Sequence, residues 1–110
     1  MKNSNSIKYD KLVRDKIPEI IESTGKQSVT EILDDEGYKN YLDAKLEEEL
    51  LEYLKSDNVE ELADLVEVIY ALLKFKGVTL EEFEKIRLVK AYKRGAFEKR
   101  ILLKEVLDQS

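Results

Sequence analysis

The stretch YKNYLDAKLEEELLEYLKSDNVEELADLVEVIYALLKFKG, residues 38–77, decides the fold. Its first part repeats apolar side chains at helical spacing, and a short polar turn from Ser56 to Asn58 separates it from a second helical pattern. The repeated apolar positions are Tyr38, Tyr41, Leu42, Leu46, Leu50 and Leu54. Because the turn is so short, the two helices are expected to be antiparallel neighbours.

The second helix of this pair is expected to run from Val59 to about Lys76. From Glu61 to Phe75, eleven of fifteen residues are apolar, so this helix should be buried on several sides. Glu61 and Asp64 nevertheless interrupt the apolar stretch, where carboxylates are costly unless they have a partner.

Capping signals mark the ends of these and further helices. Asp34 or Asp35 can cap the first helix of the pair, and Asp57 with Glu60 resembles a capping box for the second. A second capping box, Thr79 with Glu82, opens a helix to about Arg94. Pro18 suits the first turn of a short helix that ends near Ser23.

Two segments between and after the helices are ambiguous. Residues 26–33 contain Val29, Thr30 and Ile32 and predict a short strand, because β-branched side chains favour that geometry. Residues 97–107 mix apolar and charged side chains and predict a short strand followed by a helical turn. We therefore expect one all-α domain over residues 1–110, an antiparallel helical bundle with or without a short peripheral β-hairpin.

Composition excludes several classes of function. The 110 residues include neither cysteine nor histidine, so disulfides, thiolate nucleophiles, Ser-His-Asp catalysis and Cys/His zinc sites are ruled out. The net charge of −5 argues against stable nucleic-acid binding, which needs broad phosphate neutralisation. No apolar run approaches the roughly 20 residues that span a bilayer. The start, residues 1–6, lacks the apolar core of a signal peptide, so we expect a cytoplasmic protein without membrane contact.

The acidic residues of the helix pair carry the functional argument. Residues 48–52 read E-E-x-x-E, and residues 61–64 read E-x-x-D, so Glu49 pairs with Glu52 and Glu61 with Asp64 on their helix faces. Both pairs lie at similar distances from the turn and can face one another. Converging carboxylates repel unless cations intervene, which predicts one or more Mg²⁺ ions between the helices, with Mn²⁺ as the alternative. An exposed Glu-rich helix face is the simpler interpretation of residues 48–52 taken alone.

Two basic groups could hold phosphates. One group follows a single helical face, and the other precedes the only proline. Their members are Arg87, Lys90 and Arg94, and Lys11, Arg14 and Lys16. Taken separately, each group is more simply explained as a solvated surface or as ion-pairing partners of the many acids.

The ordered set of motifs resembles the all-α nucleoside triphosphate pyrophosphohydrolase superfamily, which includes MazG-type enzymes, dimeric dUTPases and phosphoribosyl-ATP pyrophosphohydrolases. The closest similarity is to short MazG-related and phosphoribosyl-ATP-pyrophosphohydrolase-like proteins, and it runs from about Tyr9 to Leu103. The motifs that carry it are Lys11-Leu12-Val13-Arg14-Asp15-Lys16-Ile17-Pro18, Lys45-Leu46-x-Glu48-Glu49, Glu61-Leu62-Ala63-Asp64-Leu65 and Arg94-Gly95-x-Phe97.

This resemblance implies a MazG-like helical bundle, Mg²⁺ dependence and assembly as a homodimer or homotetramer. It also implies hydrolysis of a nucleoside triphosphate or related nucleotide to a monophosphate and pyrophosphate, with housecleaning of non-standard nucleotides as the family-level expectation. The implied metal ligands are Glu49, Glu52, Glu61 and Asp64, with Glu48 placed to activate water. The implied phosphate-binding residues are Lys90, Arg94, Lys11, Arg14 and Lys16.

Other functions stay open at this point. Phosphoribosyl-ATP pyrophosphohydrolase activity is the second choice, because the additional residues expected for that substrate are not recognised. A non-catalytic helical module that binds a nucleotide or a protein partner is an alternative of another class. A purely structural bundle with solvated acids is disfavoured by Glu61 and Asp64, which lie within an apolar helix.

Overall fold

A computed structural model describes residues 6–108, and within that range the chain is all-α, with four helices and no strand. The helices are α1 (Ile17–Ser23), α2 (Asp35–Ser56), α3 (Val59–Phe75) and α4 (Leu80–Arg94). The chain divides into two compact units, of which the first ends at Gly77 and the second begins at Val78. The first unit contains α1, α2 and α3, and the second contains α4.

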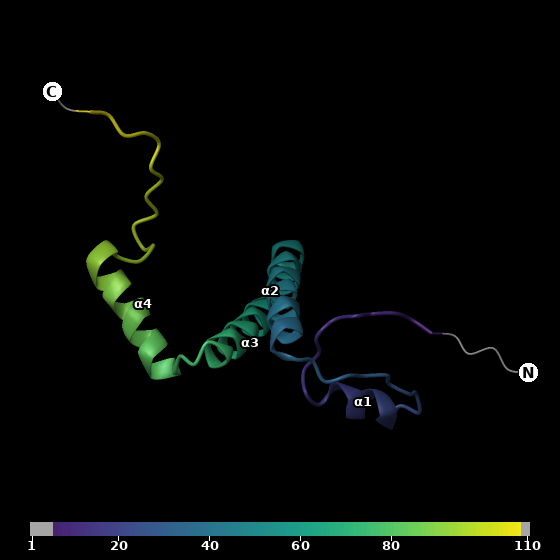
Figure 1. Cartoon of the computed structure of the whole chain (residues 1–110). Coiled ribbons are helices and arrows are strands. Elements are labelled where there is room, and N and C mark those ends of the chain that lie inside the picture. The colour runs from purple at the N-terminus through teal and green to yellow at the C-terminus, as the bar shows by residue number, and fades with distance from the viewer. Residues whose placement is uncertain (1–5, 109–110) are drawn as a thin grey trace, which may run out of the picture. The chain divides into compact units, whose positions relative to one another are not determined.

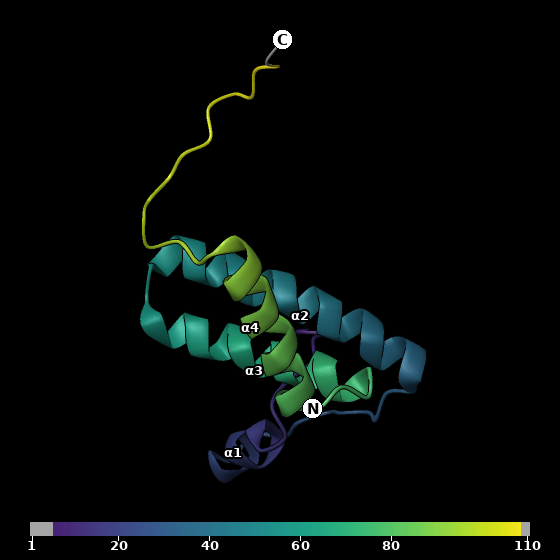
Figure 2. The ribbon, with the colours of Figure 1, turned by 90° about the vertical axis from the view of Figure 1, so that its left-hand side faces the viewer.

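Helices α2 and α3 form the antiparallel pair that the short turn predicts, and they lie side by side in Figures 1 and 2. The aromatic ring of Tyr38, near the start of α2, meets that of Phe75, the last residue of α3, edge-on at 5.8 Å between centroids. Asp34 caps α2, since its Oδ1 accepts a hydrogen bond of 2.8 Å from Gly37 N. The opposite end of the pair is closed by the turn between the two helices.

That turn differs from the prediction in its capping residue. Asp57 is not the N-cap of α3: it ends α2 in the left-handed conformation with φ 56°, and its N–H donates to Tyr53 O at 2.7 Å. The next residue, Asn58, is the N-cap, and its Oδ1 accepts from Glu60 N at 2.9 Å. Asp tolerates the left-handed region better than most residues, which frees Asn58 for the cap.

The core of the first unit is small. Leu42 on α2 is 1% exposed and Val68 on α3 is 8% exposed, and these are the buried apolar residues among those described. Burying one such side chain contributes about 1.5–3 kcal/mol. Several apolar residues of α3, among them Val59, Leu62, Val66 and Tyr70, stay partly exposed. The apolar circumference of α3 is therefore only partly covered by α2.

Neither expected strand forms within the described part of the chain. Residues 26–33 and 97–107 have no regular secondary structure, and Val29 and Ile32 are almost fully exposed. A strand needs a second strand to pair its backbone N–H and C=O groups, and β-propensity alone does not supply one. The peripheral β-hairpin is thus absent from residues 6–108, and the prediction of strands there is wrong.

The predicted bounds of α4 and the predicted end of α1 are confirmed, and α1 begins one residue earlier than predicted. Helix α1 begins one residue before Pro18 and ends at Ser23, and Gly25 follows with φ 88°. Helix α4 begins after Thr79, whose Oγ1 accepts from Glu82 N at 3.1 Å and donates to the Glu82 carboxylate at 3.0 Å. Among the helices described, none combines the length and the apolar character that crossing a bilayer would require.

Candidate metal centre

Three carboxylates converge between α2 and α3. Glu49 of α2 and Glu61 and Asp64 of α3 each present one oxygen, and these three oxygens lie within 4.8 Å of one another. The sequence spacing predicts this convergence, because Glu61 and Asp64 share a face of α3 and the short turn brings that face opposite Glu49. We call Glu49, Glu61 and Asp64 the acidic trio.

Glu49 is the most buried member of the trio. The residue is 8% exposed, and Lys45 Nζ, one helical turn earlier, lies 3.4 Å from its Oε1. A withdrawn carboxylate is costly without a cation, and Lys45 supplies that charge from the same helix. The side chain of Lys45 is itself only 18% exposed, so this pair is less screened by water than the others at the site.

Both desolvation and the neighbouring acids disfavour the ionised form of Glu61. The pKa of Glu61 is raised above its ordinary 4.5, because the carboxyl is partly withdrawn from water and because Asp64, Glu49 and Glu52 surround it with negative charge. The raised pKa means that this environment, through desolvation and through the field of the other acids, disfavours the ionised form of Glu61. A cation placed among these oxygens would reverse that field.

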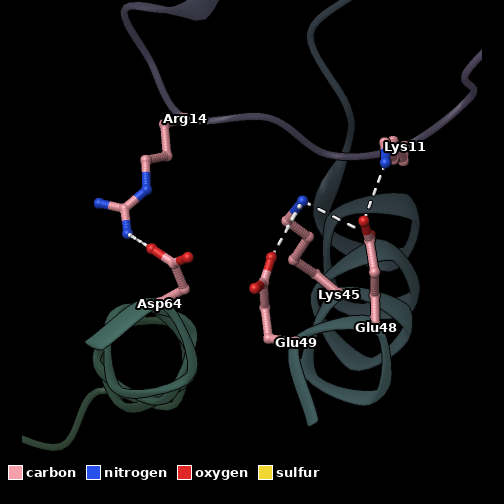
Figure 3. A network of polar contacts seen from close by, with 6 residues as sticks. All are labelled: Lys11, Arg14, Lys45, Glu48, Glu49 and Asp64. Carbon is pink, nitrogen blue, oxygen red and sulfur yellow. Dashed lines mark hydrogen bonds and ion pairs between the residues drawn. The ribbon is translucent and has the colours of Figure 1, made fainter. Parts of the chain in front are cut away.

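Glu48 lies beside the trio with two lysines as partners. Its Oε1 accepts a hydrogen bond of 2.8 Å from Lys11 Nζ, and its Oε2 lies 3.5 Å from Lys45 Nζ (Figure 3). The hydrogen bond with Lys11 lowers the pKa of Glu48 and raises that of Lys11. The Glu48 carboxylate is therefore held in its ionised form. Its expected role in activating water stays a prediction.

Arg14 forms the second contact from the N-terminal segment. Its Nη2 donates to Asp64 Oδ1 at 2.7 Å, so one member of the trio already has a cationic partner (Figure 3). Lys11 and Arg14 were expected either to bind phosphates or to pair with nearby acids, and in this structure both pair with acids. Both pairs are partly exposed, and pairs of this kind contribute about 0–1 kcal/mol each.

The other predicted residues are placed as follows. Glu52 is exposed on α2, outside the trio, although its charge acts on Lys11 and Glu61. Lys16 is exposed immediately before α1. Lys90 and Arg94 lie four residues apart on α4, which puts them on one face of that helix in the second unit.

Lys45 is the site residue whose role sequence reasoning missed. It was recognised only as part of a motif, yet it contacts both Glu48 and Glu49. The signal was present in the sequence, since a lysine three and four residues before two glutamates shares their helix face.

The three oxygens are of a kind that could hold a hard divalent cation. Three carboxylate oxygens close together match the ligands that Mg²⁺ prefers, and Mg²⁺ usually binds one or two carboxylates together with water and phosphate oxygens. Glu49, Glu61 and Asp64 are the residues that would hold it. The neighbouring cations Arg14 and Lys11 can complement the negative charge of a phosphorylated ligand.

Comparison with known proteins adds one partial relative. No family model matches the chain, and no solved structure matches it. A segment of 46 residues, 42% of this chain, is 48% identical to a protein of Mycolicibacterium smegmatis that is described only as uncharacterized. The match covers 47% of that protein, so the chain spans about half the length of the curated relative it matches.

Proposed function

We propose that this protein is a Mg²⁺-dependent pyrophosphohydrolase of the MazG-like type, which converts a nucleoside triphosphate or related nucleotide into a monophosphate and pyrophosphate. The observation that carries the proposal is the acidic trio, whose three carboxylate oxygens lie within 4.8 Å of one another between α2 and α3. The resemblance of the motifs supports the same reaction.

The electrostatics of the site support a cation as the missing partner. Three carboxylates lie together, and the pKa of Glu61 is raised, first because the carboxyl is partly withdrawn from water and then because the other acids repel its charge. Lys45 and Arg14 balance Glu49 and Asp64, whereas Glu61 has only acidic neighbours among the groups that shift its pKa. Mg²⁺ would supply Lewis-acid polarisation of the phosphate and neutralise its charge.

The chain's own residues would share the chemical work. A water molecule would attack the α-phosphorus, the bond from that phosphorus to the bridging oxygen would break, and pyrophosphate would leave. Glu48 would give up its hydrogen bond from Lys11 and accept one from the water instead. It would then orient this water and accept its proton. Arg14, Lys11 and Lys16 of the first unit would bind phosphate oxygens. Phosphate binding by Lys90 and Arg94, which lie on α4 in the second unit, stays a separate prediction.

We also propose that the protein assembles as a homodimer or homotetramer. Leu62, Val66 and Tyr70 follow one stripe of α3 and are 38%, 40% and 43% exposed. Because only two apolar residues are buried among those described, the first unit gains stability if a second copy covers this stripe. Sedimentation of the full chain would test this: a monomer at micromolar concentration would contradict it.

One observation favours a second function, a nucleotide-binding module without turnover. Glu48 is engaged by two lysines and its pKa is lowered, and both features weaken a carboxylate as a base. Such a module would bind nucleotide with Mg²⁺ but release no pyrophosphate. Binding and turnover must therefore be measured on the same preparation.

The decisive experiment is pyrophosphate release from a panel of canonical and modified nucleotides, each with Mg²⁺ and with EDTA. We expect release from at least one nucleotide class with Mg²⁺ and none with EDTA. Glu47→Gln is the matched control for substitutions in the trio, because Glu47 is an exposed acid of α2 outside it. Binding of nucleotide without release of pyrophosphate would favour the nucleotide-binding module. A protein that shows no binding and no release would overturn the proposal.

A further inference from the structure

The segment that precedes α1 connects the two helices that hold the acidic trio. Lys11 reaches Glu48 on α2 at 2.8 Å, and Arg14 reaches Asp64 on α3 at 2.7 Å (Figure 3). The segment itself has no regular secondary structure from residue 6 to residue 14. We call residues 7–16 the strap, because its side chains tie α2 to α3 beside the trio.

The contacts of the strap are easy to break. The side chains of Arg14 and Asp64 are 56% and 42% exposed, whereas those of Lys45 and Glu49 are 18% and 11% exposed. Exposed ion pairs are weak because water and salt screen them and because two flexible side chains must be held in place. The ion pair of Lys45 with Glu49 is therefore the more persistent one, and the ion pair of Arg14 with Asp64 is easier to break.

A divalent cation in the trio would compete with the strap. Asp64 is both the acceptor for Arg14 and a member of the trio, so a bound cation and the guanidinium would share one carboxylate. Like charges that share an acceptor repel, and each weakens the binding of the other. The same reciprocity requires that losing the arginine charge strengthens cation binding.

We propose that the strap is an electrostatic latch on the acidic trio, which a divalent cation releases by displacing Arg14 from Asp64. This inference rests on the proposed function, because it takes the trio as the cation site. Release leaves the Arg14 guanidinium without its carboxylate, so cation binding would precede and promote the capture of a phosphate group by the strap.

The test measures Mn²⁺ affinity by calorimetry on the full chain, comparing wild type, Arg14→Gln and Lys8→Gln. Lys8 is an exposed residue of the same strap outside the network of Figure 3, so Lys8→Gln removes the same charge without breaking a contact to the trio. We expect Arg14→Gln to bind Mn²⁺ about two- to fivefold more tightly than Lys8→Gln, the range that an exposed ion pair supports. Circular dichroism of each variant verifies that the helices are intact.

A second readout follows the strap directly. Trypsin should cleave after Arg14 faster when Mn²⁺ is added to the wild-type chain, while cleavage after Arg100, in the segment that follows α4, should not change. Equal Mn²⁺ affinities of Arg14→Gln and Lys8→Gln would overturn the latch and leave the proposed function standing. A wild-type chain that binds no Mn²⁺ would instead overturn the metal-dependent function, and the latch with it.

Discussion

Arg14 donates a hydrogen bond of 2.7 Å to Asp64 across 50 positions of the sequence, which joins the N-terminal segment to α3 at the acidic trio. Asp64 therefore has two roles in this structure, as a member of the trio and as the acceptor for a cation from outside the helix pair. Substituting it changes both, and the two effects can be separated by measuring activity and stability together.

Asp64→Asn should reduce Mg²⁺-dependent pyrophosphate release by at least about 100-fold, since even outer-shell partners of metal ligands cost 10- to 100-fold when lost. The melting temperature should change little, because the loss of the weak, partly exposed Arg14–Asp64 pair is offset by less repulsion between residue 64 and Glu61. Activity assays and thermal melts with Glu47→Gln as the control would check this. A fully active Asp64→Asn variant would contradict the assignment of Asp64 as a metal ligand.

Glu61→Gln should raise the melting temperature of the cation-free protein at pH 7. The folded-state pKa of Glu61 lies above its ordinary 4.5, so folding favours the protonated form. The associated stability is present below pH 4.5 and is lost as the pH rises through the folded pKa. The neutral Gln avoids that loss, so the variant's advantage should disappear below pH 4.5. Thermal melts in EDTA at pH 7 and below pH 4.5 would show it, and an advantage that persists at low pH would exclude the ionisation of Glu61 as its cause.

The helices could be predicted from the sequence because their signals are local. Apolar spacing, Pro18 and the cap at Thr79 act within a few residues, and the observed helices begin and end close to the predicted positions. The strand prediction failed for residues 26–33 because a strand depends on a distant pairing partner, which local composition does not reveal.

In the candidate site, too, contacts set by local spacing could be predicted and contacts with a distant segment could not. Convergence of Glu49 with Glu61 and Asp64 follows from helix periodicity and a short turn, and it could be predicted, whereas Glu52, expected to join them, is exposed outside the trio. The pairing of Arg14 with Asp64 could not, because no spacing rule connects an irregular segment to a helix 50 residues away. From the sequence alone, the basic residues before Pro18 are therefore equally consistent with phosphate binding and with ion pairing to nearby acids.

Asn58→Ala should lower the free energy of unfolding by about 1 kcal/mol, the usual loss for an N-cap residue. Asn58 Oδ1 accepts from Glu60 N at 2.9 Å, and alanine leaves that N–H without its side-chain acceptor. Urea unfolding followed by circular dichroism would measure the change. Asn40→Ala is the control. Asn40 is an exposed residue inside α2 rather than at its end, so this substitution should not destabilise the protein.

Lys11→Gln should make the protein slightly less stable than wild type at pH 7, by up to about 1 kcal/mol for a partly exposed pair. The folded-state pKa of Glu48 is lowered from 4.5 by its hydrogen bond with Lys11, so this stability is present above pH 4.5. It is lost as the pH falls through the folded pKa, and the two proteins should then melt together. Thermal melts at pH 7 and at pH 3 would decide, and a difference that stays constant would show that Lys11 acts by packing rather than by charge.

Lys45→Gln should be the most destabilising of these charge substitutions, because it leaves Glu49 without its cation. The Glu49 side chain is 11% exposed, and removing the partner of a withdrawn carboxylate costs more than breaking an exposed pair. We expect a loss of about 1–3 kcal/mol in the free energy of unfolding, by analogy with other polar groups left unpaired. Adding Glu49→Gln to Lys45→Gln should restore part of the loss, since the unpaired charge is then gone.

Saturating Mg²⁺ should also restore stability in Lys45→Gln but not in the double variant, because a cation in the trio replaces the lysine only where the Glu49 carboxylate remains. If Mg²⁺ stabilises neither variant, Glu49 is a structural acid paired with Lys45 and not a metal ligand.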